Sequence, residues 1–194
     1  MEHKGTNYIE TERLILRPFT LKDAPAMYRN WASDDAVTRF LTWPSHKDLS
    51  VTEQVLGDWI SHYSEANYYQ WAIVFKEYLN EPIGCIGVNN RISDRLKIAH
   101  IGYCIGQNWW HKGIVSEALE RIIKYLFDEI GVNRIESRHD PKNPNSGAVM
   151  KKCGMKQEGI LRQSDWNNQG ICDAVYYAIL ADEWRQETGR EGSA

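Results

Sequence analysis

A long amphipathic helix that follows three strand-like runs is the feature that most limits how this chain can fold. From Ile114 to Ile130, apolar residues recur every three or four positions, the spacing that places them on one face of an α-helix. They are Val115, Ala118, Leu119, Ile122, Ile123, Leu126, Phe127 and Ile130. Charged residues take the other face, so the helix must cover a hydrophobic surface that the strands supply.

The three strand-like runs are separated by short polar breaks and lie at 68–75, 82–92 and 97–106. This spacing is typical of an antiparallel meander. After the long helix we expect further elements: a strand at 134–139, a short helix around 146–152, and strands at 155–164 and 171–180 joined by a turn at 167–170. The order predicts an α+β fold, in which helices flank a mixed and mostly antiparallel sheet.

The first sixty residues predict one strand and two helices. LILRPF, residues 14–19, has the pattern of a strand that Pro18 ends. Thr20 with Asp23, and Ser50 with Glu53, match the capping-box pattern at a helix start. We therefore expect one helix to be capped by Thr20 and the other by Ser50.

Length and composition set further limits. The 194 residues predict a single domain, 1–194, with a core at about 8–184 and a flexible polar tail at 185–194. A net charge of −3 argues against a nucleic-acid partner. We see no secretory signal and no apolar run of about 18 residues, so we expect a cytoplasmic protein. The four cysteines lie far apart without a C-x-x-C pair, and we expect buried thiols and no metal.

The start of the long helix has no ordinary cap. If Gly113 is the N-cap, no side-chain oxygen accepts from the first helical amides. Ser116 stands where a capping box needs Glu or Gln. The amides at the positive end of the helix dipole then need another partner, and either water or an anion such as a phosphate group could supply it.

Two motifs around this helix resemble those of the GNAT superfamily of N-acetyltransferases. Trp110-His111-Lys112-Gly113-Ile114-Val115 aligns with the superfamily's diphosphate loop, Q/R-x-x-G-x-G/A, and keeps its central Gly113. The pattern N-x-x-S-x-x-x-x-x-K-x-G-[FM] is matched by Asn143, Ser146, Lys152, Gly154 and Met155. With the opening TERLILRPFTLKDA, the chain is most similar to the ribosomal-protein N-terminal (alanine) acetyltransferase type, from Thr11 to about Trp184.

The resemblance implies a fold and acetyl-CoA as cosubstrate. The sheet would splay between the strands at 97–106 and 134–139, and the pantetheine arm would pair there with main-chain groups near Cys104 and Ile105. The diphosphate would sit on the amides of 111–116. The implied cofactor-binding residues are therefore Cys104, Ile105, His111, Lys112, Gly113, Ile114, Val115, Ser116 and Asn143.

The resemblance also suggests catalytic residues for acetyl transfer to an amine. Many superfamily members place a tyrosine near the leaving sulfur, but Met150 stands at that position here. Ser146 matches a serine that the ribosomal-protein type uses near the sulfur, although it could instead cap the short helix. Asp165 aligns with an acidic residue that would act as base or amine anchor, although it could instead belong to the turn before Gly170. A main-chain amide near Ile105 would stabilise the carbonyl oxygen.

The acceptor is expected to be an amine, and the first choice is a peptide or protein N-terminus. An α-amine with a pKa of about 7.7–8.0 needs less help from a base than a lysine amine at about 10.4. Trp43, Tyr68 and Trp166 are candidates for the walls of an acceptor cleft. A small-molecule amine, such as a polyamine, an amino-acid derivative or an antibiotic, is the alternative substrate. A non-catalytic acyl-CoA sensor is the alternative function, and the oligomeric state is left open, a dimer included.

Overall fold

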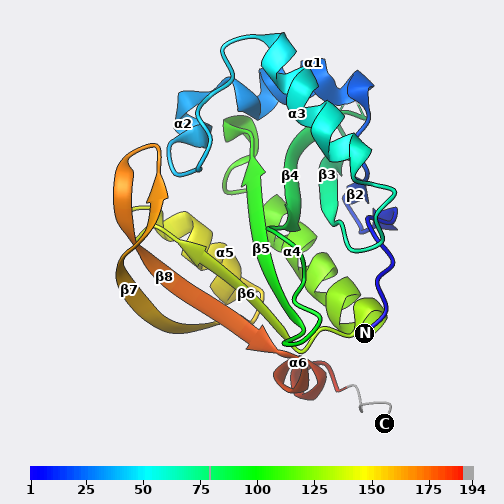
Figure 1. Ribbon diagram of the computed structural model, residues 1–194, viewed down its shortest axis with the longest axis vertical. Helices are drawn as coiled ribbons and strands as arrows, with labels where there is room; N and C mark the ends of the chain where they lie inside the picture. The colour runs from blue at the N-terminus through cyan, green and yellow to red at the C-terminus, as the bar shows by residue number, and fades with distance from the viewer. Residues whose placement is uncertain (79, 190–194) are drawn as a thin grey trace.

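One mixed sheet of eight strands organises the molecule (Figure 1). The computed structural model describes residues 1–78 and 80–189. The spatial strand order is β1-β2-β3-β4-β5-β6-β8-β7, and every neighbouring pair is antiparallel except β5 and β6. The strands are β1 Ile9–Glu10, β2 Leu14–Arg17, β3 Gln70–Phe75, β4 Pro82–Val88, β5 Ile98–Ile105, β6 Arg134–His139, β7 Lys156–Asn167 and β8 Gly170–Leu180.

Helices cover the two faces of the sheet with separate hydrophobic clusters. Helices α4 (Ile114–Tyr125) and α5 (Pro144–Lys152) share one cluster with inward residues of the central strands. Helices α1 (Ala24–Met27), α2 (Asp35–Thr38) and α3 (Leu49–Ser61) share another, which includes Ala72 and Cys85. A π-helical turn, Leu126–Ile130, extends α4, and α6 (Ala181–Thr188) follows β8.

The predicted α+β class is confirmed, and the expected strands and helices occur in the predicted order, whereas β1, α2 and α6 were not predicted. The strand expected at 14–19 is β2, which ends at Arg17, directly before Pro18. The predicted capping pair at Thr20 forms, because the Thr20 amide donates to Asp23 Oδ2 at 2.8 Å. The helical segment that follows Thr20 begins with a 3-10 turn, Leu21–Asp23. Among the described residues, no helix is long and apolar enough to cross a membrane.

The predicted cap of α3 was wrong by two residues. Asp48, rather than Ser50, is the N-cap, and its Oδ1 accepts from the amides of Ser50 at 2.9 Å and Val51 at 3.3 Å. The Ser50 hydroxyl donates to the same carboxylate at 2.6 Å. A carboxylate is a strong acceptor at the positive end of a helix, which explains why the helix begins at Leu49 and leaves Ser50 in its first turn.

Three other boundaries differ from expectation. Helix α5 begins at Pro144 with Asn143 as its N-cap, so Ser146 lies inside the first turn and does not cap it. Asp165 lies within β7 rather than in the turn that follows. Helix α6 continues through Thr188, so part of the expected tail at 185–194 is helical, and residues 190–194 lie outside the described residues.

The parallel pair at the centre of the sheet comes apart as expected. Strands β5 and β6 pair only through Ile98–His100 and Arg134–Glu136. Beyond this point the Ser137 hydroxyl donates to the Ile101 carbonyl at 2.8 Å, and the remaining parts of the two strands diverge (Figure 1). The edge of β5 from Gly102 to Ile105 therefore faces no partner strand on that side.

Candidate functional site

The start of α4 is bare, as the sequence predicts. Gly113 is the N-cap, has φ +72° and ψ 6°, and offers no side-chain hydrogen bond to the helix. His111, two residues earlier, also has a positive φ of 59°. Backbone that alternates between left- and right-handed conformations can turn successive N–H groups toward a common anion. The loop and the helix dipole together therefore provide donors for a negatively charged group.

Two cationic side chains lie beside this helix start. A Cβ added at Gly113 would be 3.7 Å from Arg13 Nη2 and 3.8 Å from Lys152 Nζ. Arg13 is held in place by its Nε, which donates to Glu117 Oε2 at 2.6 Å, and its Nη1, which donates to the Lys112 carbonyl at 3.1 Å. Positive charges therefore gather where the amides are bare, and this arrangement fits an anion better than water alone. The sequence did not reveal the part taken by Arg13, which lies 100 positions before Gly113.

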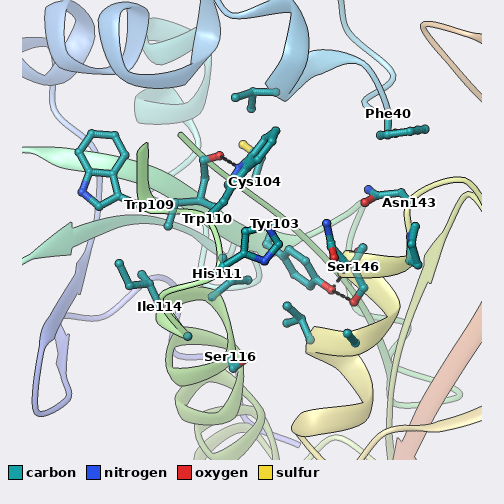
Figure 2. A pocket seen from close by; sticks show the side chains of 18 of the residues that line it. Phe40, Tyr103, Cys104, Trp109, Trp110, His111, Ile114, Ser116, Asn143 and Ser146 are labelled. Atoms are coloured by element: carbon teal, nitrogen blue, oxygen red, sulfur yellow. Dashed lines mark hydrogen bonds between the residues drawn. The ribbon is translucent and has the colours of Figure 1, made fainter. Parts of the chain in front are cut away.

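A cavity of about 430 Å³ opens from this helix start along the edge of β5. Most of the expected cofactor-binding residues line it: Cys104, Ile105, His111, Gly113, Ile114, Val115, Ser116 and Asn143. Figure 2 shows His111 and Ile114 at the start of α4, with Cys104 and Tyr103 on β5 beside them. Lys112 is exposed and lies outside the lining. The Ile105 carbonyl accepts from Trp110 Nε1 at 3.0 Å, so an indole already engages one of the main-chain groups expected to bind pantetheine.

A second cavity of about 770 Å³ is lined by residues of β4, β5 and β6 together with α3 and the chain that follows α2. It contains three of the residues expected near the acceptor, Trp43, Tyr68 and Asp165. Trp166 does not line either cavity, and its side chain is 56% exposed. Successive residues of a strand point to opposite faces, so Trp166 is turned away from the cavity that Asp165 lines.

The two cavities meet at one place. The residues that line both are Phe40, Leu41, Tyr103, Cys104, Asn143 and Ser146. At this junction the Tyr103 hydroxyl donates to the Ser146 carbonyl at 2.9 Å and lies 3.1 Å from Ser146 Oγ (Figure 2). Burial raises the pKa of the Tyr103 hydroxyl, so it remains protonated at neutral pH. The sequence analysis did not identify Tyr103. Strand alternation predicts the face of the sheet on which this side chain lies, but it does not predict the contact with α5 across the gap between β5 and β6.

Asp165 is bound to an arginine within the second cavity. Arg138 Nε donates to Asp165 Oδ2 at 2.5 Å and Arg138 Nη2 to Oδ1 at 3.2 Å. His100, which also lines this cavity, lies 3.5 Å from the Glu136 carboxylate through its Nδ1. Burial, and next the charge of Arg138, lower the pKa of His100, so this imidazole is neutral at pH 7. No motif or spacing in the sequence indicated the roles of Arg138 and His100 at this site.

The tip of the β7–β8 hairpin is joined by hydrogen bonds to the wall of the second cavity. Asn168 Nδ2 donates to the Thr38 carbonyl at 2.9 Å and to the Trp43 carbonyl at 2.8 Å. Its amide donates to the Leu41 carbonyl at 3.1 Å. Figure 1 shows the hairpin reaching toward the chain that follows α2. One asparagine thereby joins two segments that are more than 120 residues apart, and it fixes Trp43 and Leu41 on the cavity wall.

All four cysteines are free thiols. Cys85 and Cys153 are buried, whereas Cys104 and Cys172 are half-buried. Within residues 1–78 and 80–189, no group of three or more His, Cys, Asp or Glu side chains is arranged to hold a metal ion.

Comparison with known proteins identifies the family. Residues 13–156 match the family model described as an acetyltransferase (GNAT) domain. The chain is 33% identical over 177 residues to an uncharacterized N-acetyltransferase, p20, of Bacillus licheniformis, covering 90% of this chain and 96% of that protein. It is 32% identical over 146 residues to the ribosomal-protein-serine acetyltransferase of Escherichia coli (strain K12), covering 73% and 78%.

A solved structure has the same fold. It is RimL, a ribosomal L7/L12 α-N-protein acetyltransferase in complex with coenzyme A, with a TM-score of 0.80 and 22% identity over 91% of this chain and 99% of that one. At this identity the likeness concerns the fold alone. The family model, the two relatives and the paired cavities agree, and the chain therefore belongs to the GNAT family of acetyl-CoA-dependent acetyltransferases.

Proposed function

We propose that this enzyme transfers the acetyl group of acetyl-CoA to the α-amine of a peptide or protein N-terminus. The observation that carries the proposal is the meeting of two cavities at Tyr103, Cys104 and Ser146. One cavity begins at the cationic helix start, and the other has aromatic walls and an acidic residue. The Escherichia coli relative named as a ribosomal-protein-serine acetyltransferase supports a protein acceptor.

The residues at the start of α4 would hold the diphosphate of the cosubstrate. In this proposal the amides of 111–116 donate to its oxygens, and Arg13 and Lys152 neutralise its charge. Asn143, at the start of α5, would contact the pantetheine arm from the opposite wall. The position of Lys112, outside the cavity lining, favours a role for its main chain rather than its side chain.

Ser146, assisted by Tyr103, would stabilise the leaving sulfur. A CoA thiolate has a conjugate acid pKa near that of an ordinary thiol, about 8.5, so a hydrogen bond provides much of the help it needs. The Tyr103 hydroxyl is 3.1 Å from Ser146 Oγ and can donate to it when the serine turns its own proton toward the sulfur. This pair would take the part that the tyrosine absent at Met150 plays elsewhere in the superfamily.

Asp165 would anchor or deprotonate the incoming amine, with Arg138 fixing its orientation. Both carboxylate oxygens are engaged by the guanidinium, and this favours the anchoring role. An α-amine has a pKa of about 7.7–8.0, so about a tenth of it is neutral at pH 7 without any base, compared with less than about one in a thousand for lysine. The site therefore fits a low-pKa amine.

The test is release of the CoA thiol when acetyl-CoA is mixed with matched acceptors. We expect turnover with a short peptide that has a free N-terminus, and none with the same peptide when its N-terminus is blocked and a lysine remains. Mass spectrometry of the product locates the acetyl group. Ser146→Ala and Tyr103→Phe should lower kcat by at least about tenfold while leaving the KM for acetyl-CoA nearly unchanged. Equal rates in both variants and the native enzyme would exclude these roles.

A small-molecule amine is the second candidate, because the acceptor cavity has the size of a small-ligand site. A volume of about 770 Å³ falls within the usual range for small-ligand sites. Turnover with a polyamine or an amino-acid derivative, but with none of the peptides, would favour this substrate class. Binding of acetyl-CoA without thiol release from any amine would favour a sensor.

A further inference from the structure

Two cysteines, far apart in the sequence, face each other across the centre of the sheet. Cys85 on β4 and Cys104 on β5 are directly opposite in the antiparallel ladder, and their Sγ atoms are 3.5 Å apart. Opposite residues of antiparallel strands have Cα atoms about 4.5 or 5.5 Å apart. Both values lie within the range that a disulfide spans, about 4.4–6.8 Å. The backbone is therefore already close enough for a bond between these sulfurs.

One cysteine of the pair lies at the junction of the two cavities, and the other lies beside it. Cys104 lines both of them, and Cys85 lines the acceptor cavity. A small oxidant that enters the acceptor cavity therefore reaches both cysteines. The other two cysteines have different partners, because Cys153 donates to the Ser116 carbonyl at 3.3 Å and Cys172 lies 3.4 Å from Asn167 Nδ2.

The chemistry of the pair favours thiol oxidation. The hydrogen bond from the Cys104 thiol lowers the pKa of the Cys85 thiol. The same contact, together with burial, raises the pKa of Cys104. The Cys85 sulfur is therefore the better nucleophile, since thiolates rather than thiols react with oxidants. The Cys104 sulfur lies in contact with it. A nucleophilic cysteine beside a resolving cysteine is the usual arrangement of a redox-sensitive site.

We propose that Cys85 and Cys104 form a reversible disulfide that weakens acetyl-CoA binding and so slows acetyl transfer. With a peroxide as oxidant, the Cys85 thiolate attacks one peroxide oxygen, the O–O bond breaks, and a sulfenic acid and hydroxide form. The Cys104 sulfur then attacks the Cys85 sulfur, the S–O bond breaks, and the second oxygen leaves as water. The two thiols lose two electrons and two protons in total, and the peroxide becomes two waters. A dithiol reverses the change by thiol–disulfide exchange.

Closing the bond must disturb the cavity junction. The sulfurs have to approach from 3.5 Å to about 2.0 Å. The two strands are already close together here, since a Cβ added at Gly84, beside Cys85, would be 2.4 Å from the Cys104 carbonyl oxygen. The adjustment therefore falls on the Cys104 side chain and the β5 edge that lines the cofactor cavity. A disulfide that lines an open cavity is accessible to a dithiol and therefore easier to reduce than a sealed one, as a reversible site requires.

The test combines mapping of the bond with a measurement of cofactor binding. The full chain is treated with hydrogen peroxide, remaining thiols are alkylated, and a non-reducing peptide digest is analysed by mass spectrometry. We expect a cross-linked peptide pair that contains Cys85 and Cys104 and disappears with dithiothreitol. Calorimetry should give a Kd for CoA at least about fivefold higher in the oxidised protein, with recovery on reduction.

Variants make the test specific. Cys85→Ser should form no cross-link, and its CoA affinity should be insensitive to peroxide when compared with its own untreated sample. Cys153→Ser and Cys172→Ser are matched controls that should behave as the native chain does. The proposal fails if peroxide gives no Cys85–Cys104 peptide, or if the bond forms and CoA affinity is unchanged. The inhibition of transfer rests on the proposed function, but mapping and CoA binding need no acceptor, so the two can fail separately.

Discussion

Replacing Gly113 tests whether the left-handed start of α4 is built for the cosubstrate. At φ +72°, a residue with a Cβ is disfavoured by about 1–2 kcal/mol. The added methyl would otherwise fit, because its nearest atoms are 3.7 and 3.8 Å away at the tips of Arg13 and Lys152. In Gly113→Ala the cost is therefore backbone strain alone. If binding requires this conformation, CoA affinity should fall by about 5–30-fold.

Proline at the same position gives a larger effect with a different cause. Its ring locks φ near about −65° and removes the N–H, so the loop cannot keep its present conformation. A penalty of about 3 kcal/mol or more corresponds to a loss of over about 100-fold in CoA affinity. The expected order of affinities is native, then Gly113→Ala, then Gly113→Pro, as measured by calorimetry with CoA at one pH and salt concentration.

Gly57 supplies the matched control. It lies inside α3, and a Cβ added there meets nothing within 4 Å. Gly57→Ala should raise the free energy of unfolding by about 0.5–1 kcal/mol and leave CoA affinity unchanged. If Gly113→Ala binds CoA as the native protein does, with unchanged stability in chemical denaturation, the left-handed conformation is not needed and the assignment of this loop to the diphosphate is refuted.

Three further predictions concern stability and the acceptor cavity. Burial would raise the pKa of the Asp23 carboxyl, but hydrogen bonds from Arg17 lower it overall. Its contribution is therefore complete above the unfolded-state value of about 3.9 and is lost as the pH falls through the lower folded value. Asp23→Asn should lower the free energy of unfolding by about 3 kcal/mol at pH 7. Denaturation curves should show this difference shrinking below about pH 4. Asn168→Ala removes two hydrogen bonds of about 0.5–1.5 kcal/mol each, so hydrogen exchange should accelerate in the loop that carries Trp43. Trp43→Ala should raise the acceptor KM more than Trp166→Ala does, and equal effects would contradict the assignment of the acceptor cavity.

Local pattern predicted most elements of the fold, and it missed β1, α2 and α6, which span only two, four and eight residues. The spacing of apolar residues from Ile114 onward and the glycine before them are properties of adjacent residues, and both the helix and its bare start at Gly113 are confirmed. The order of strands from Gln70 to Ile105 is confirmed for the same reason. The cap of α3 was missed because two acceptors stand close together, and the carboxylate of Asp48 outcompetes the hydroxyl of Ser50.

The contacts that complete the site could not be predicted locally. Arg13 reaches Gly113, and Tyr103 reaches Ser146, only after the sheet has assembled. Periodicity says which face a side chain takes, but it does not say which distant element lies opposite. The facing of Cys85 and Cys104 has the same origin, since it depends on the register between β4 and β5. The roles proposed for Ser146 and Asp165 stay predictions until kinetics test them.

The separation of β5 from β6 explains why these contacts form where they do, because it exposes main-chain groups in the middle of a sheet. Buried amides and carbonyls must find partners, and beyond His100 the edge of β5 finds none on β6 other than the Ser137 hydroxyl. Tyr103 spans the gap with a side chain, and Trp110 engages the Ile105 carbonyl. In the proposed function, the groups that these side chains do not reach would pair with the amides of a pantetheine arm. A further strand in this gap would pair with the edge of β5 and occupy the proposed cofactor cavity, so the acetyl transfer that we propose depends on the interrupted pairing.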